Sequence, residues 1–177
     1  MAARRQQRLV NLVLCLLSTR QYIHGRLNPA WERPDLEISP VGSYPWAETE
    51  RAFAGIADDA AGSDADGVSL RYTNPWTGGP VMPTIDCRIS RLRPGFRGTA
   101  HRHTTSTIYH VVRGEGATIV DGERLDWHDR DVFAVPGWAA HEHVNPAGRD
   151  AFLFSYSDEP AIRALGLYRE DVVERQG

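Results

Sequence analysis

The chain has 177 residues, of which 41% are hydrophobic and 24% are charged, and these proportions are typical of a soluble globular protein. Its formal net charge of −3 gives no overall field that would attract nucleic acid or an anionic membrane. The two cysteines, Cys15 and Cys87, can build neither a disulfide framework nor a C-x-x-C site, which favours a cytoplasmic location.

The amino-terminal segment, residues 1–37, contains an apolar stretch at residues 9–17 after a basic start. The stretch is far shorter than the roughly 20 residues that span a bilayer. It resembles a short signal peptide, but Asn11 interrupts it and no small-x-small cleavage site follows. We favour either a docking helix or a stretch outside the ordered domain, followed by an extended arm rich in proline.

Residues 38–67 are predicted to lead into the main domain. The stretch "PWAETERAFAGI" (45–56) indicates a short helix with Ala52, Phe53 and Ile56 available to pack. The stretch "ADDAAGSDADG" (57–67) is small and acidic, and its composition is typical of a mobile linker.

Residues 68–170 show short β-type runs separated by turn residues. The predicted strands lie at residues 84–92, 106–112, 131–136 and 151–157, and the last two are expected to be buried. Asp121 and Gly122 stand between two further runs, which is typical of a two-residue hairpin. We therefore expect an all-β fold, a small antiparallel barrel or jelly roll, closed by a helix near Pro160 that Asp158 could cap. Residues 171–177 are expected to form a tail.

Three histidines form the candidate chemical site. Side chains two positions apart on a strand share a face, so His101 and His103 aim at one spot. His141 follows the predicted strand at 131–136 and can supply a third imidazole. Such a set can hold a metal ion and leave other coordination positions open.

The motif around these histidines resembles the cupin superfamily. It runs from Gly95 through the H-x-H pair to Gly114, and then through Pro136 and His141 to Asn145. Thr107 stands where the superfamily usually has a glutamate ligand, and Arg130 and Trp138 replace turn glycines.

Longer stretches are similar to the carboxy-terminal cupin of gentisate 1,2-dioxygenase and its relatives that cleave salicylate and hydroxynaphthoate. The similarity covers roughly residues 38–170 and is carried by residues 43–53, 72–85, 100–116, 131–145 and 153–170.

The resemblance implies a cupin double-stranded β-helix and a non-haem Fe(II) enzyme that opens a hydroxylated aromatic carboxylate with O2. These enzymes usually have two cupins, and this chain has one. A structural or metal-holding cupin that mediates oligomerisation, or pairs with a separate cupin, is therefore a rival. A small-molecule-binding regulatory cupin is a second rival, although no helix-turn-helix is recognisable.

Further side chains are candidates for the site. His143 shares the face of His141 and could accept a proton or support the ligands, or be a structural histidine. Thr107 and Tyr109 share the parity of His103, so they could contribute a substrate wall and a hydroxyl donor, or simply fill the barrel. Trp138 could stack on an aromatic ring or belong to the core. The arginines that could pair with a substrate carboxylate are Arg88, Arg97, Arg102 and Arg113, of which parity disfavours Arg102.

Overall fold

The computed structural model of the chain describes residues 39, 41–56 and 62–174. They belong to two compact units, one drawn from Met1–Ala57 and Thr73–Met82 and the other from Asp58–Tyr72 and Pro83–Gly177. The predicted amino-terminal helix and most of the proline-rich arm lie outside the described residues. None of the described helices is long and apolar enough to cross a membrane.

The first unit contains the predicted short helix, α2 (Trp46–Ala54). Pro45 precedes it with a φ of −62°, the value to which its ring restricts the backbone. Phe53 is buried, as expected, whereas Ala52 faces solvent. The hydroxyl of Tyr44 donates a hydrogen bond to the carbonyl oxygen of Thr73 at 2.8 Å, which joins the segment before the helix to residues 73–82 of the same unit.

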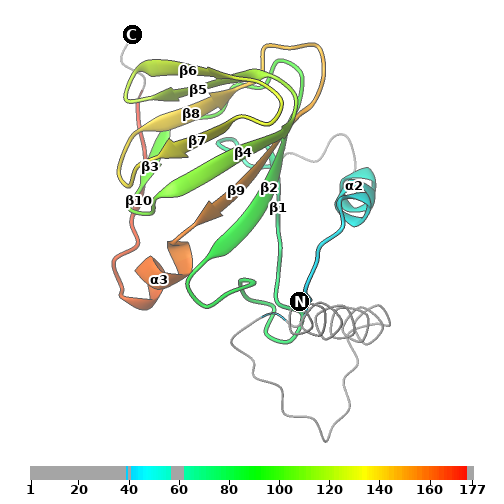
Figure 1. The fold of residues 1–177 in the computed structure, drawn as a ribbon. Coiled ribbons are helices and arrows are strands. Elements are labelled where there is room, and N and C mark those ends of the chain that lie inside the picture. Colours follow the sequence, from blue (N-terminus) through cyan, green and yellow to red (C-terminus); the bar gives the residue numbers. More distant parts are fainter. Residues whose placement is uncertain (1–38, 40, 57–61, 175–177) are drawn as a thin grey trace, which may run out of the picture. The chain divides into compact units, whose positions relative to one another are not determined.

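The second unit consists of two antiparallel sheets of five strands each (Figure 1). The first sheet has the order β1-β2-β9-β4-β7, with β1 (Val68–Arg71), β2 (Asp86–Leu92), β4 (Thr107–Arg113), β7 (Val132–Val135) and β9 (Ala151–Ser157). The second has the order β10-β3-β8-β5-β6, with β3 (His101–His103), β5 (Gly116–Val120), β6 (Glu123–Trp127), β8 (His141–Val144) and β10 (Glu170–Val172). Most neighbouring strands are not consecutive in the chain, which is the topology of a jelly roll. The predicted all-β fold is confirmed.

An apolar cluster holds the barrel together. Its largest fully buried members come from both sheets: Leu92, Val111, Trp127, Val135 and Leu153. Burying one such side chain stabilises the fold by about 1.5–3 kcal/mol. The cluster therefore fixes β4 and β9 of the first sheet against the second sheet, which carries the histidine strands β3 and β8.

Three turn residues adopt the left-handed backbone conformation without being glycine. Asp121 has a φ of 49° and is followed by Gly122 at 87°, so the predicted two-residue hairpin between β5 and β6 is confirmed. Arg130 and Trp138 have φ values of 73° and 69°. These are the two positions at which the cupin motif has glycine, so the backbone keeps the glycine conformation and the larger residues adopt it under strain.

Several details differ from the sequence predictions. The run at residues 131–136 is not a buried strand, because β7 lies at the edge of its sheet and Val132 is 65% exposed. Asp158 precedes α3 (Glu159–Ala164) but makes no side-chain cap. Its Oδ1 instead accepts a hydrogen bond from the backbone N–H of Ser106 at 3.0 Å. The last strand, β10, extends beyond residue 170 into the expected tail.

Candidate metal centre

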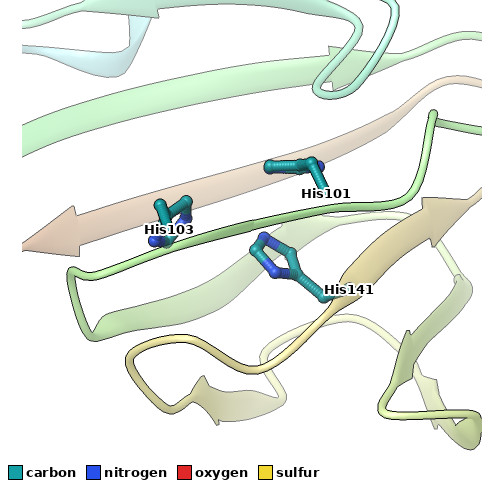
Figure 2. Close-up of side chains that lie close together, drawn as sticks. All are labelled: His101, His103 and His141. Atoms are coloured by element: carbon teal, nitrogen blue, oxygen red, sulfur yellow. The ribbon is translucent and has the colours of Figure 1, made fainter. Parts of the chain in front are cut away.

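His101, His103 and His141 converge inside the barrel (Figure 2). His101 pairs directly with His141 across β3 and β8, so both side chains stand on the same face of the sheet. The ring centroids of this pair are 4.2 Å apart, and those of His103 and His141 are 5.0 Å apart. Each residue can offer one ligand atom, and the three atoms lie within 4.8 Å of one another. The predicted convergence of three imidazoles is therefore present.

The backbone determines which ring nitrogen each histidine offers. Every Nδ1 lies within hydrogen-bond distance of a backbone carbonyl oxygen two residues away: His101 to Thr99 at 3.1 Å, His103 to Thr105 at 3.0 Å and His141 to Ala139 at 3.1 Å. A carbonyl can only accept, so Nδ1 carries the proton and Nε2 keeps its lone pair. The Nε2 atom of His141 is buried and has no hydrogen-bond partner among the described residues. This arrangement fits a metal ion bound through three Nε2 atoms.

Burial also favours the neutral imidazole, the form that binds metals, at His141 and His103. It lowers the pKa of His141 to about 3, and the neighbouring His101 lowers that pKa further. Burial likewise lowers the pKa of His103. Three neutral donors would leave the full charge of a divalent cation uncompensated by the protein.

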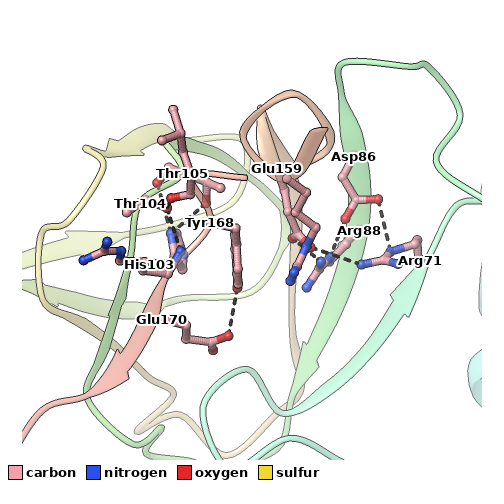
Figure 3. Close-up of polar contacts among 12 residues, drawn as sticks. Arg71, Asp86, Arg88, His103, Thr104, Thr105, Glu159, Tyr168 and Glu170 are labelled. Carbon is pink, nitrogen blue, oxygen red and sulfur yellow. Dashed lines mark hydrogen bonds and ion pairs between the residues drawn. The ribbon is translucent and has the colours of Figure 1, made fainter. Parts of the chain in front are cut away.

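A polar cavity of about 270 Å³ opens on two of these histidines, His101 and His103. Its lining includes His101, His103 and the side chains of Thr107 and Tyr109 on β4. Beyond Tyr168, Figure 3 shows an ion-pair network on the far side from His103. In this network Arg71 and Arg88 both pair with Asp86 and Glu159.

Comparison with known proteins assigns the fold and its family. The cupin domain family matches residues 88–156. The 5-aminosalicylate 1,2-dioxygenase of a Comamonas species is 47% identical over 160 residues, which are 90% of this chain and 42% of that protein. The 1-hydroxy-2-naphthoate 1,2-dioxygenase of a Nocardioides species is 40% identical over 82% of this chain and 37% of its own length.

The crystal structure of a gentisate adduct of salicylate 1,2-dioxygenase from Pseudoaminobacter salicylatoxidans superposes with a TM-score of 0.77. Its identity is 31%, over 89% of this chain and 44% of that one. This chain carries a cupin of the gentisate 1,2-dioxygenase family. The cupin and its flanking residues span less than half the length of these relatives.

Two of the predicted site residues of this cupin lie away from the cavity. Trp138 is 40% exposed, and its ring stacks under the guanidinium of Arg102, whose Cζ is 4.6 Å from the ring centroid. Its backbone N–H donates to the carbonyl oxygen of His103 at 2.6 Å. Trp138 therefore supports the strand that carries His103 and forms no wall of the cavity.

His143 is fully buried behind Tyr109. The two rings meet edge to face, with centroids 4.7 Å apart. The Nδ1 of His143 is 2.9 Å from the hydroxyl of Thr118, which also accepts a hydrogen bond from Trp127 at 3.0 Å. Burial lowers the pKa of His143 well below its ordinary value. The position suits a supporting residue for Tyr109 better than a group that contacts a substrate.

The structure distinguishes between the four candidate arginines. Only Arg88 lines the cavity with the histidines. Arg97 pairs with Glu142 at 2.6 Å, Arg102 pairs with Asp171 at 3.1 Å, and Arg113 lies over the ring of Phe152. Arg102, which parity disfavoured, is not among the residues that line this cavity. Arg88 is paired with Ser155 in the sheet and Ser155 with Tyr109, so Arg88 and Tyr109 share a face.

Several residues of the cavity lining were missed in the sequence, and three of them carry ionisable groups close to the histidine strands. Asp66 comes from the stretch interpreted as a linker, and Tyr168 and Glu170 come from the segment after α3. Ser63 and Gly67 in fact close a tight turn through two backbone hydrogen bonds, with nitrogen-to-oxygen distances of 2.7 and 2.9 Å. The available signal was the small, turn-forming composition of "SDADG", which predicts a tight turn as readily as a linker.

Proposed function

We propose that this cupin holds Fe(II) through His101, His103 and His141 and opens the ring of gentisate or a similar hydroxylated aromatic carboxylate with O2. The observation that carries the proposal is the set of three pre-oriented imidazoles, two of which, His101 and His103, line a polar cavity. The family membership narrows the reaction to aromatic ring cleavage. When bound, Fe(II) would supply positive charge for an anionic chelate and an open position for O2.

Tyr109 and Thr107 contribute two uncharged hydroxyl groups to the cavity beside the histidines. Both are buried on β4 and line the cavity. Burial raises the pKa of Tyr109 above its ordinary value, so its hydroxyl keeps its proton and can donate a hydrogen bond to a substrate oxygen. Thr107 is neutral where other cupins carry a glutamate, which leaves the charge of a cation available to an anionic substrate.

Arg88 is the cavity residue best suited to hold a substrate carboxylate. Its Nε donates to Asp86 at 2.6 Å, and its Nη2 atom pairs with Glu159. These two buried acids fix the guanidinium plane, while the side chain remains 32% exposed. The remaining N–H groups of a guanidinium that is already fixed can donate hydrogen bonds to a substrate carboxylate without much loss of conformational entropy.

The test is turnover by the purified chain after anaerobic loading with Fe(II). We expect ring-opened product when gentisate and then O2 are added. His141→Ala should bind less iron and give no product, whereas His110→Ala, on the outward face of β4, should retain both. Stoichiometric iron without any product would rule out autonomous dioxygenase activity.

A further inference from the structure

The cavity contains one acidic side chain that lacks a partner among the described residues. Glu159 is paired with Arg88 and Arg163, and Glu170 accepts a hydrogen bond from Tyr168 at 2.8 Å. Asp66 also lines the cavity and is half-buried. Within the described part of the chain, its carboxylate makes no hydrogen bond and no ion pair. A half-buried carboxylate without a partner is costly unless a ligand or water satisfies it.

A hydrogen-bonded turn holds the backbone of Asp66 in place. Ser63 and Gly67 close the turn with two backbone hydrogen bonds. The hydroxyl of Ser63 accepts from the backbone N–H groups of Ala65 and Asp66, both at 3.2 Å. Gly67 has a φ of 68°, a conformation that a residue with a Cβ adopts only under strain. The carboxylate is therefore presented by a defined turn.

The same turn is attached to the strand of the metal centre. The N–H of Thr99 donates to the carbonyl oxygen of Asp64 at 2.8 Å, and the carbonyl of Thr99 orients the ring of His101. A Cβ at Gly98 would collide with the carbonyl oxygen of Ala65, so only glycine permits this close approach. The turn that carries Asp66 is thus connected to His101 through Thr99.

The negative charge of Asp66 also affects the pKa values of two residues that line the cavity. Burial raises the pKa of Tyr109, and the negative charge of Asp66 raises it further. Burial lowers the pKa of His103, and the charge of Asp66 opposes this change. Asp66 is close enough to act on groups from both sheets, so a ligand beside the histidines would also be near this acceptor.

We propose that Asp66 is a specificity-determining residue, which accepts a hydrogen bond from an amino or hydroxyl substituent on the ring of the bound aromatic acid. The inference rests on the proposed function, because it places the chelating end of the ligand at the three histidines. A ring that carries only the chelating hydroxyl and carboxylate offers nothing to this acceptor. The cavity should therefore prefer salicylates with an additional donor group.

The experiment measures binding without O2, so that it does not depend on turnover. Fe(II)-loaded protein is titrated anaerobically by calorimetry with gentisate, 5-aminosalicylate and salicylate, and then with the positional isomers of gentisate. Asp66→Asn keeps the shape of the side chain and removes its charge, and Asp66→Ala removes the acceptor. The matched control is Asp64→Asn, because Asp64 is an exposed aspartate of the same turn.

We expect Asp66→Ala to weaken binding of gentisate and 5-aminosalicylate by roughly tenfold to a hundredfold, the range for hydrogen bonds to charged groups. Asp66→Asn should show a smaller loss of the same kind. Salicylate affinity should change less than about twofold, and Asp64→Asn should match the wild type for all ligands. The positional isomer that is most sensitive to Asp66→Ala identifies the ring position that contacts it.

Equal losses for all three ligands, or no loss for any, would overturn the inference, and so would failure of all three to bind. If the selective loss is found but O2 yields no ring-opened product, the proposed function fails and the inference stands. The two results are therefore distinguishable.

Discussion

Thr105 contacts the ring of His103 through two atoms. Its carbonyl oxygen is 3.0 Å and its hydroxyl oxygen 2.7 Å from Nδ1 of His103. His101 and His141, by contrast, are each oriented by a single backbone carbonyl. His103 is also the more accessible of the three ligands, and it is the one that has this additional contact.

Removing this hydroxyl should weaken metal binding. Thr105 is 2% exposed, so Thr105→Val keeps the packing while deleting the contact. We expect roughly tenfold lower metal affinity, the low end of the range for groups that orient a metal ligand, because the carbonyl remains. Competition with a chelator measures the change. Ser106→Ala, an exposed change in the same turn, should have no effect, and equal losses in both variants would contradict the account.

The stability of the metal-free protein should depend on pH through its buried histidines. Burial lowers the pKa of His141 to about 3 and that of His143 well below the ordinary value of 6.5. The folded-state pKa is therefore below that of the unfolded chain. The stability from the neutral rings is present above pH 6.5 and is lost as the pH falls from there toward about 3.

Urea unfolding between about pH 7.5 and about pH 5 tests this dependence. Well below the unfolded-state pKa, each such histidine lowers the free energy of unfolding by up to about 1.4 kcal/mol per pH unit. His143→Gln should reduce the slope even if it also lowers stability overall. An unchanged slope would show that His143 is not held neutral by the fold.

How far the sequence predicts the site depends on how regular the backbone is. His101 and His103 were located by the alternation of side chains along a strand, and the structure preserves it there. Trp138 could not be placed in this way, because it lies in the turn before β8 and its φ of 69° interrupts the alternation. A residue at a glycine position of a turn cannot be assigned to a face by counting from the next strand.

Residues outside the barrel strands could not be placed by periodicity at all. Asp66 reaches the cavity from a turn before β1, and Glu170 from β10, which pairs with β3 across the chain. Glu170 pairs with His103 and therefore shares its face. Such long-range pairings are fixed by the topology of the fold, and the local pattern of a short, acidic, exposed strand gives no sign of them.

The strained turn residues predict a stabilising substitution. Arg130 is exposed and has a φ of 73°. Arg130→Gly should relieve the strain, partly offset by the greater entropy of glycine in the unfolded chain, and raise the free energy of unfolding by about 0.5–1 kcal/mol. Chemical unfolding measures it. Arg124→Gly, within β6, should instead destabilise the protein, and a loss in both variants would argue against backbone strain at Arg130.

Arg88 should contribute to the affinity for an anionic substrate and have little effect on metal binding. Arg88→Lys keeps the charge but loses the planar edge, so we expect roughly tenfold weaker binding of gentisate by the Fe(II)-loaded protein. Metal stoichiometry should be unchanged. The control is Arg97→Lys, which alters an arginine paired with buried Glu142 outside this cavity. Unaltered gentisate affinity in Arg88→Lys would remove Arg88 from the substrate site.

The most direct measurement of the central claim is the metal content of the chain and of its histidine variants. Protein purified without added metal, and protein loaded anaerobically with Fe(II), are analysed for bound metal per chain. We predict one ion per loaded wild-type chain, a large loss in His101→Ala, His103→Ala and His141→Ala, and full retention in His110→Ala. Folded wild-type protein that binds no metal, or triad variants that keep the ion, would contradict the assignment of His101, His103 and His141 as its ligands.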